Sequence, residues 1–162
     1  MAGKSNKLRL TDWPEFNVFV FSLLLNYPWE LMQMPLFLGM RESTHGVAIK
    51  ACTYATLGDG VIMLLAYWGG ALLVQDRRWI ARPRRAPILT MIGIGVALTV
   101  LLERWAIVSA WGWRYAENMP VVPMLGVGLI PVLQWVILPP LLVWFVKRQL
   151  AEATSNGSSD LF

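Results

Sequence analysis

Four long apolar segments constrain this chain more than any other feature of its sequence. They run over residues 16–38, 54–74, 87–108 and 124–146. An α-helix needs about 20 predominantly apolar residues to cross the hydrocarbon core of a bilayer. In a chain of 162 residues, 56% of them hydrophobic, four such segments predict an all-α polytopic membrane protein, folded as a four-transmembrane-helix bundle.

No linker separates the four segments, so we expect a single transmembrane domain over residues 1–150. Residues 151–162 are predicted to be a disordered cytoplasmic tail, because residues 155–160 are rich in serine with one glycine and one asparagine. Pro28 and Pro35 interrupt the first segment and Pro139 and Pro140 the fourth. Since proline removes a backbone hydrogen bond, we expect helices 1 and 4 to be kinked.

The basic residues set the orientation of the predicted helices. Fourteen lysines and arginines are present. Ten lie in the N-terminal segment, the middle connection and the tail: Lys4, Lys7, Arg9, Arg77, Arg78, Arg82, Arg84, Arg85, Lys147 and Arg148. Four lie at or near the other two connections: Arg41, Lys50, Arg104 and Arg114. Because cytoplasmic loops carry an excess of positive charge, both termini are predicted to be cytoplasmic, in a bacterial inner (plasma) membrane.

Five polar side chains lie inside the apolar segments, namely Asn26, Glu30, Asp59, Glu103 and Gln134. An ionisable group at the centre of a membrane helix costs about 2.5 kcal/mol or more, so such groups often serve a function. They are therefore candidates for an intramembrane site.

The depths of the three acids agree. At about 1.5 Å of rise per residue, Glu30 lies about 21 Å from the inner start of its segment and Glu103 about 24 Å from the start of its own, while Asp59 lies about 8 Å from the outer start of a descending segment. Gln134 falls near the midplane. We therefore predict an acidic pocket in the periplasmic half, with Glu30, Asp59 and Glu103 as its catalytic groups.

Further residues are predicted to bind a substrate in this pocket. Asn26, Glu30 and Gln33 share one stripe of the first helix. The set also includes two tryptophans deep in their segments, two residues of the connection after the third segment, and an amide of the fourth segment. These are, in that order, Trp29 and Trp135, Trp113 and Tyr115, and Gln134. Other interpretations stay open, because amides also join membrane helices by hydrogen bonds and acids near a helix end snorkel to water.

The sequence predicts neither a metal nor a cofactor. Cys52 is the only cysteine and His45 the only histidine, so no cluster of soft ligands exists. The glycine pairs Gly93/Gly95 and Gly126/Gly128 lack the strand–turn–helix context of a nucleotide loop. The basic middle connection is explained by topogenesis and contact with anionic lipids, so we expect no nucleic-acid partner.

Several motifs carry a resemblance to known proteins. They are Asn26-Tyr-Pro-Trp-Glu30 with Gln33 and Pro35, then Gly58-Asp59, Glu103, Trp113 with Tyr115, Met119-Pro120, and Gly126-Val-Gly128 with Pro131 and Gln134-Trp135. In these the chain resembles an uncharacterised family of small four-helix bacterial inner-membrane proteins, which implies no activity. Glu103, Gly112, Trp113, Tyr115 and Pro131 also give a weaker resemblance to carotenoid-biosynthesis membrane proteins of the hydratase and cyclase types. The doubled acidic motif of the cyclases is absent.

Three functional hypotheses follow. In the first, the pocket binds a lipid or isoprenoid-like molecule or acts on it by acid–base chemistry, with Glu30 as proton donor, Glu103 or Asp59 as base or stabiliser, and Trp29 and Trp135 stabilising a cation. In the second, an oligomer transports protons or a cation. In the third, the chain is a non-catalytic subunit or assembly factor. The expected partners are membrane lipids, a hydrophobic small molecule and further copies of the chain; whether it is an enzyme is left open.

Overall fold

The computed structural model describes residues 9–109 and 112–159, and this part of the chain is dominated by four α-helices. They are α1 (Pro14–Gln33), α2 (His45–Val74), α3 (Arg85–Val108) and α4 (Leu129–Ser159). Short 3₁₀ helices cover Leu10–Asp12, Met34–Leu36 and Trp79–Ala81. Two short antiparallel strands, β1 (Val121–Val122) and β2 (Val127–Gly128), form a hairpin ahead of α4.

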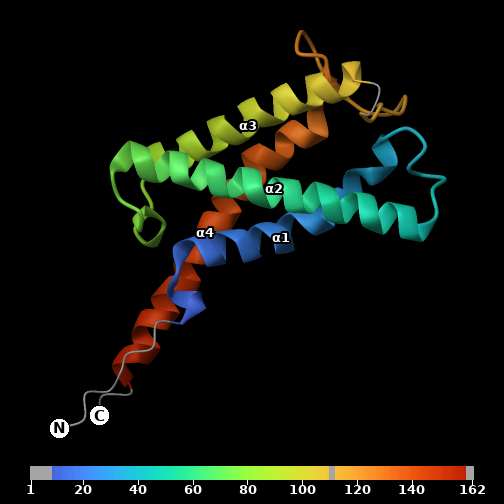
Figure 1. Ribbon diagram of the computed structural model, residues 1–162. Helices are drawn as coiled ribbons and strands as arrows, with labels where there is room; N and C mark the ends of the chain where they lie inside the picture. The colour runs from blue at the N-terminus through green and yellow to red at the C-terminus, as the bar shows by residue number, and fades with distance from the viewer. Residues whose placement is uncertain (1–8, 110–111, 160–162) are drawn as a thin grey trace.

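The helices form a ring in which each packs against two others. α1 contacts α2 and α4, and α3 contacts the same two helices. The start of α1, the end of α4 and the α2–α3 connection lie at one end of the molecule, while the α1–α2 and α3–α4 connections lie at the other (Figure 1). α4 crosses the other helices obliquely rather than running parallel to them (Figure 1). The ring surrounds an interior that polar side chains from all four helices can reach.

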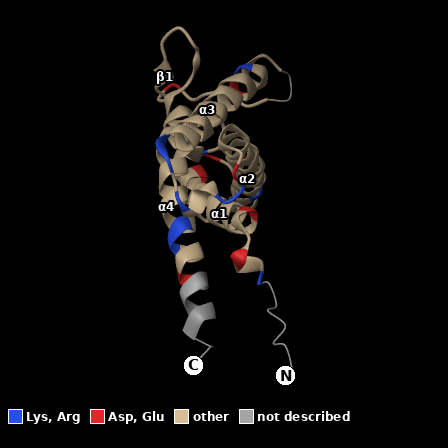
Figure 2. Ribbon diagram, turned by 90° about the vertical axis from the view of Figure 1, so that its left-hand side faces the viewer, with Lys and Arg blue, Asp and Glu red and all other residues tan. Residues whose placement is uncertain are grey.

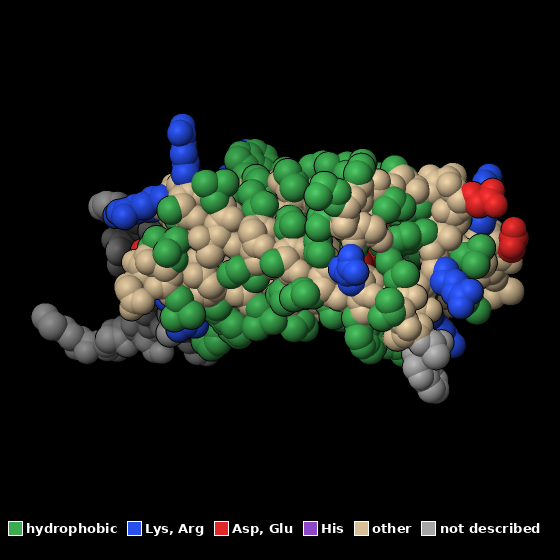
Figure 3. Space-filling view, turned by 90° about the horizontal axis from the view of Figure 1, so that it is seen from above, with side chains coloured by type: hydrophobic (Ala, Val, Ile, Leu, Met, Phe, Trp, Pro, Cys, Tyr) green, Lys and Arg blue, Asp and Glu red, His purple; other side chains and the backbone are tan. Residues whose placement is uncertain are grey.

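Three helices in the described part of the chain are long and apolar enough to cross a membrane, over residues 45–74, 85–108 and 129–152. Large apolar side chains such as Leu72, 70% exposed, lie on the outside of the molecule. Uncharged residues make up most of the helical ribbon in Figure 2, and on the face seen in Figure 3 hydrophobic side chains cover the middle while most charges lie towards the ends. These features indicate a membrane protein.

α1 is not among these three helices. It has 20 residues, but five of its buried side chains are polar or acidic: Asn17, Ser22, Asn26, Glu30 and Gln33. The prediction was a bundle of four membrane-spanning helices. The described part of the chain contains a bundle of four helices, and three of them have the length and hydropathy of a span. The polar stripe that lowers the hydropathy of α1 faces the other helices.

Several helix boundaries differ from the sequence-based ones. α2 begins at His45 rather than at residue 54, because its first turns carry polar and small residues that an apolar pattern does not detect. α4 begins at Leu129 rather than at 124, since the preceding hairpin needs left-handed backbone at Met124 (φ 69°) and Gly126 (φ 65°). α1 ends at Gln33, where Pro35 falls in a following 3₁₀ turn.

The C-terminal segment also differs from its prediction. α4 continues to Ser159, into residues that were assigned to a disordered tail, and residues 160–162 lie outside the described part of the chain. Pro28, Pro139 and Pro140 are accommodated inside continuous helices. Lys4, Lys7 and Trp111 also lie outside the described residues.

An apolar core fills the end of the bundle that holds the α2–α3 connection. Tyr67 of α2 stacks on Trp79 with ring centroids 5.8 Å apart, and the Trp79 indole N–H donates to the Tyr67 carbonyl at 3.3 Å. Arg77 forms a salt bridge with Glu15 at 2.5 Å, which ties this connection to the first turn of α1. This end of the molecule is closed by packing.

The two connections at the opposite end are joined by backbone hydrogen bonds. The Leu38 N–H donates to the Arg114 carbonyl at 2.8 Å, and the Ala116 N–H donates to the Leu36 carbonyl at 2.9 Å. Phe37 and Tyr115 face each other across this bridge, with ring centroids 5.9 Å apart. The pairing holds the segment that follows α3 over the end of the bundle.

Candidate functional site

The centre of the polar interior is Gln134 of α4, which is 3% exposed. Its Nε2 donates to Asn26 Oδ1 on α1 at 2.7 Å and to Asp59 Oδ2 on α2 at 2.8 Å. Glu30 Oε1 is also near, at 3.4 Å. Because an amide nitrogen has two hydrogens, the two short contacts use its donors, and Gln134 thereby joins three helices.

Glu30 takes its short hydrogen bond from its own helix. Gln33 Nε2 donates to Glu30 Oε1 at 2.6 Å, three residues apart on α1. This contact sets the orientation of the Gln33 amide, since a carboxylate oxygen accepts from nitrogen and not from oxygen. Glu30 also interacts directly with the carboxyl group of Asp59. Two acids from neighbouring helices therefore meet beside one amide.

Asn26 positions Gln134 rather than facing open space. Asn26 Nδ2 donates to the Ser22 carbonyl at 2.8 Å and to the Ser22 hydroxyl at 2.9 Å, while its Oδ1 accepts from Gln134. Asn26 is fully buried. A side chain with all its hydrogen bonds satisfied inside the protein acts as a fixed support for its neighbour.

Glu103 of α3 is held from the connection above it. Its Oε2 accepts a hydrogen bond from the Trp113 indole N–H at 3.2 Å and another from the Tyr115 hydroxyl. The Tyr115 oxygen in turn accepts from the Gly128 backbone N–H at 2.8 Å. Burial, together with the hydrogen bond to Glu103, raises the pKa of Tyr115 above its ordinary value, so the phenol remains a donor.

These acids share one cavity of about 470 Å³. Five of its polar lining residues were predicted for the site: Glu30, Gln33, Asp59, Glu103 and Gln134. Most of the rest of its wall is apolar or aromatic, from Met34, Phe37, Met40, Ile62, Leu102, Trp113, Pro131 and Trp135. A volume of 300–1,000 Å³ with an apolar wall and a few convergent polar groups is typical of small-molecule sites.

The mouth of the cavity lies between α2 and α3. Its lining residues that are exposed on the outer surface are Tyr54 (74% exposed), Ala55 and Gly58 of α2, Leu102 (44%) of α3, and Trp113 (43%) of the connection that follows α3. Small side chains at positions 51, 55 and 58 recur on one face of α2 and leave room there. Both α2 and α3 are long and apolar enough to cross a membrane.

Seven of the ten residues predicted for the site line the cavity: Glu30, Gln33, Asp59, Glu103, Trp113, Gln134 and Trp135. Asn26 and Tyr115 do not line it and contact it through Gln134 and Glu103. Trp29 does not line the cavity. Trp29 lies one residue before Glu30, about 100° away around the helix, and packs against the apolar core with its indole N–H buried and without a partner.

Sequence reasoning missed part of the wall. Phe37 and Met40 of the α1–α2 connection, and the small residues of α2, belong to it. The spacing of Ala51, Ala55 and Gly58 was the available signal, but Ala51 lies before residue 54, where the second helical segment is predicted to begin. Arg104 of α3 donates to the Leu125 carbonyl at 2.9 Å.

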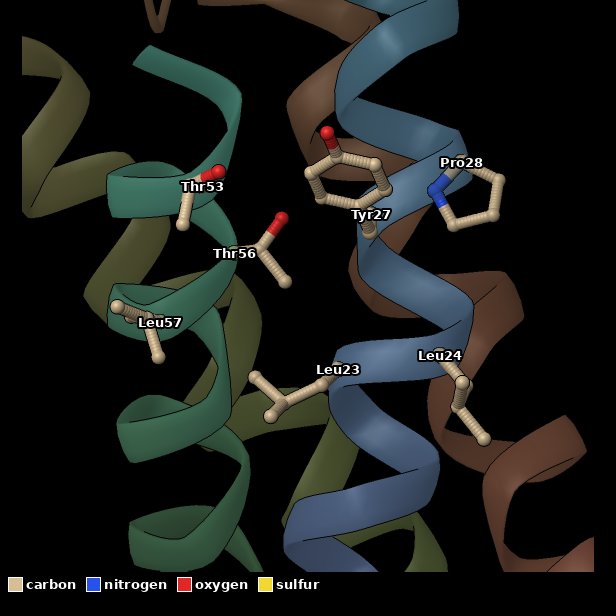
Figure 4. A pocket seen from close by; sticks show the side chains of 7 residues that line it. All are labelled: Leu23, Leu24, Tyr27, Pro28, Thr53, Thr56 and Leu57. Atoms are coloured by element: carbon tan, nitrogen blue, oxygen red, sulfur yellow. The ribbon is translucent and has the colours of Figure 1, made fainter. Parts of the chain in front are cut away.

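A second hollow lies on the outer surface between α1 and α2. It has a volume of about 400 Å³. Figure 4 shows Thr53, Thr56 and Leu57 of α2 opposite Leu23 and Tyr27 of α1. It holds no charged group, so the chemistry of this chain is better sought in the acidic cavity.

The donor set does not favour a metal ion. Within residues 9–109 and 112–159, no three histidine, cysteine or acidic side chains are grouped in a way that could hold one. Comparisons with protein-family models, with curated proteins and with solved structures gave no match for this chain. The function therefore has to be argued from the cavity itself.

Proposed function

We propose that this chain is an integral inner-membrane protein that binds a hydrophobic molecule with a polar end, such as a lipid or an isoprenoid-like compound. The observation that carries the proposal is the cavity of about 470 Å³, which combines a largely apolar wall with three acids. A molecule dissolved in the bilayer enters through the lipid-facing mouth between α2 and α3. Its apolar part packs on the wall and its polar end reaches the carboxyl groups.

The proposal includes a topology. α1 completes a set of four spans with kinks at Pro28 and at Pro139–Pro140, and both termini lie in the cytoplasm, where ten of the fourteen basic residues are placed. The cavity then opens in the periplasmic half. Reporter fusions at Thr44 and Asn118 should read periplasmic, and fusions at Arg82 and Ser155 cytoplasmic. The reverse pattern would place the cavity in the cytoplasmic half and end this part of the proposal.

A steric block of the mouth tests binding. A Cβ built on Gly58 meets no atom within 4 Å, and the same is true of Gly93 on α3. Gly58→Leu therefore fills the mouth at little cost in folding, and Gly93→Leu, which does not line the cavity, is the matched control. Each protein is purified in mild detergent, incubated with a bacterial polar-lipid extract and measured by native mass spectrometry.

The expected result is a bound small molecule on the wild type and on Gly93→Leu, and its loss from Gly58→Leu. If all three proteins carry the same adducts, the molecule lies elsewhere and the cavity is not a binding site. If none of them carries an adduct while their helical content is unchanged, the binding function fails.

Acid–base catalysis is a second candidate, and the direct interaction of Glu30 with Asp59 favours it. One carboxyl group can protonate one carbon of an alkene, which leaves a cation on the other alkene carbon. The second carboxyl group can then remove a proton from the next carbon beyond that cation, which moves the double bond without a cofactor. Trp135, in the same wall, offers an aromatic face to the intermediate cation. Lipid and pigment extracts from a deletion strain complemented with wild type or with Glu30→Gln test this step, and identical extracts from both would exclude it.

Ion transport is less well supported. In the described part of the chain, the core between the cavity and the cytoplasmic end is apolar, with Met63, Tyr67 and Leu142 among its buried members. Such packing offers no chain of ionisable groups across the inner half.

A further inference from the structure

The acidic cavity has more hydrogen-bond acceptors than donors. No N–H or hydroxyl group of the described residues donates to Oε2 of Glu30, Oδ1 of Asp59 or Oε1 of Glu103. The donors that these acids do receive, from Gln33, Gln134, Trp113 and Tyr115, all go to the other carboxyl oxygen of each pair. Apart from the interaction between the Glu30 and Asp59 carboxyl groups, one oxygen of each acid receives no hydrogen bond from the described residues.

A fourth acceptor stands beside them. Gln33 is 5% exposed and lines the cavity, and its Oε1 is buried without any hydrogen-bond partner. Buried polar atoms in native proteins are almost always paired, so one that is left unpaired needs an explanation. A ligand that donates a hydrogen bond at this position would supply the missing partner.

The charged groups that line the cavity also favour a ligand that donates hydrogen bonds. Three carboxylic side chains line the cavity, and none of the described residues that line it is lysine, arginine or histidine. A phosphate or carboxylate head would find no cation here and would meet three acids. The aromatic rings of Trp113 and Trp135 in the wall attract cations rather than anions.

From this balance we infer that the ligand's polar end is a hydrogen-bond-donating, positively charged nitrogen group carried on an apolar body, that is, a lipophilic amine. The inference rests on the proposed binding function and adds the chemical class of the ligand. An ammonium group has three donors and no acceptor, which matches a ring of free carboxylate and amide oxygens. The long apolar part packs on the wall towards the mouth, where Tyr54 and Leu102 lie.

The test compares three probes with the same chain and different heads: tetradecylamine, tetradecan-1-ol and tetradecanoate. Each competes with the bound molecule, or raises the melting temperature, of the purified full-length protein in mild detergent. Hydrogen bonds to charged groups are stronger than neutral ones, so we expect the amine to bind about ten-fold more tightly than the alcohol. The fatty acid should bind most weakly.

Variants in which an acid is replaced by its amide test whether the preference for the amine depends on the cavity acids. Glu30→Gln, Asp59→Asn and Glu103→Gln each replace one carboxyl group by an amide of the same shape, and each should reduce the preference for the amine over the alcohol. Glu117→Gln, which alters an exposed acid outside the cavity, is the control and should keep the full preference.

The outcomes separate this inference from the binding function. If the alcohol or the fatty acid binds as well as the amine, and Gly58→Leu abolishes that binding, the cavity is a lipid site but the ligand class is wrong. If the amine is preferred equally by the wild type and all three cavity variants, its nitrogen does not contact the acids and the inference is also wrong. Binding of no probe, with no adduct from the lipid extract, removes both.

Discussion

Gly95 of α3 gives the sharpest test of how the cavity wall is packed. A Cβ built on Gly95 would lie 1.9 Å from Cε3 of Trp135 and 2.5 Å from Cδ2 of the same ring. Ordinary contact begins at 3.4 Å, so Gly95→Ala requires a relative movement of about 1.5 Å (3.4 minus 1.9) between helix α3 and a rigid indole. Trp135 is 1% exposed and lines the cavity.

The magnitude follows from two opposing effects. Replacing glycine by alanine inside a helix stabilises it by about 0.8–1.0 kcal/mol, whereas inserting a methyl group into a filled site costs about 1–3 kcal/mol, occasionally more. Gly93→Ala, two residues away on the same helix, receives only the first effect because its Cβ meets no atom within 4 Å. At about 2–4 °C per kcal/mol for a chain of this size, Gly95→Ala should melt several degrees below Gly93→Ala.

Thermal unfolding in detergent, followed by circular dichroism and tryptophan fluorescence, measures the difference. Combining Gly95→Ala with Trp135→Leu should recover part of the loss, because the large ring is the clashing group. Equal melting temperatures for the two alanine variants would mean that Trp135 does not sit on Gly95, and the description of the cavity wall would be refuted.

Two further effects are expected. Burial raises the pKa of Glu15, but the hydrogen bond and charge of Arg77 lower this pKa by more, so its net value lies below the ordinary 4.5. A carboxyl group whose pKa is lowered by folding stabilises the folded protein above its unfolded-state pKa, and that stabilisation is lost on acidification. Glu15→Gln should therefore reduce the fall in melting temperature below pH 4.5. Tyr115→Phe removes the hydrogen bonds to Glu103 and from the Gly128 N–H and should cost about 1–2 kcal/mol by urea or thermal unfolding; an unchanged stability would show that the phenol does not hold the connection.

The sequence was informative where geometry is local. Glu30 and Gln33 are three residues apart on one helix, and their contact follows from helical periodicity alone. The shared cavity of Glu30, Asp59 and Glu103 follows from counting residues along helices that alternate in direction, because the rise per residue is fixed. Both inferences need only that the apolar segments are helical.

What the sequence could not supply depends on packing between distant segments. The start of α2 at His45 has no apolar signal, because its early turns are exposed or line the cavity. The hydrogen bonds from Trp113 and Tyr115 to Glu103 depend on the pairing of two connections, at Leu38 with Arg114 and at Ala116 with Leu36. The direction of Trp29 depends on the rotation of α1 about its axis, which its own prolines make hard to assign.

Asp59 decides between a binding site and polar residues that only join helices. Aspartate at the centre of a membrane helix costs about 2.5–3.5 kcal/mol, whereas leucine contributes about −0.3 to −0.6 kcal/mol. Replacing Asp59 removes one hydrogen bond, which Asp59 accepts from Gln134 at 2.8 Å. Gln134 keeps Asn26 at 2.7 Å and has Glu30 within 3.4 Å, so it is not left without acceptors.

Asp59→Leu should therefore raise the melting temperature by a few degrees while it abolishes ligand binding, which is the expected trade between stability and function at a site kept for its chemistry. The measurement is thermal unfolding in detergent beside native mass spectrometry of the same preparation. Leu57→Ala, on the outer face of the same helix, controls for a general effect on α2 and should retain the ligand. If Asp59 served only to hold α2 against α4, its loss would lower the melting temperature, because the net hydrogen bond would be the whole of its contribution. A destabilised variant that still binds the ligand would therefore identify the acid as structural, and the cavity would have to be explained by Glu30 and Glu103 alone.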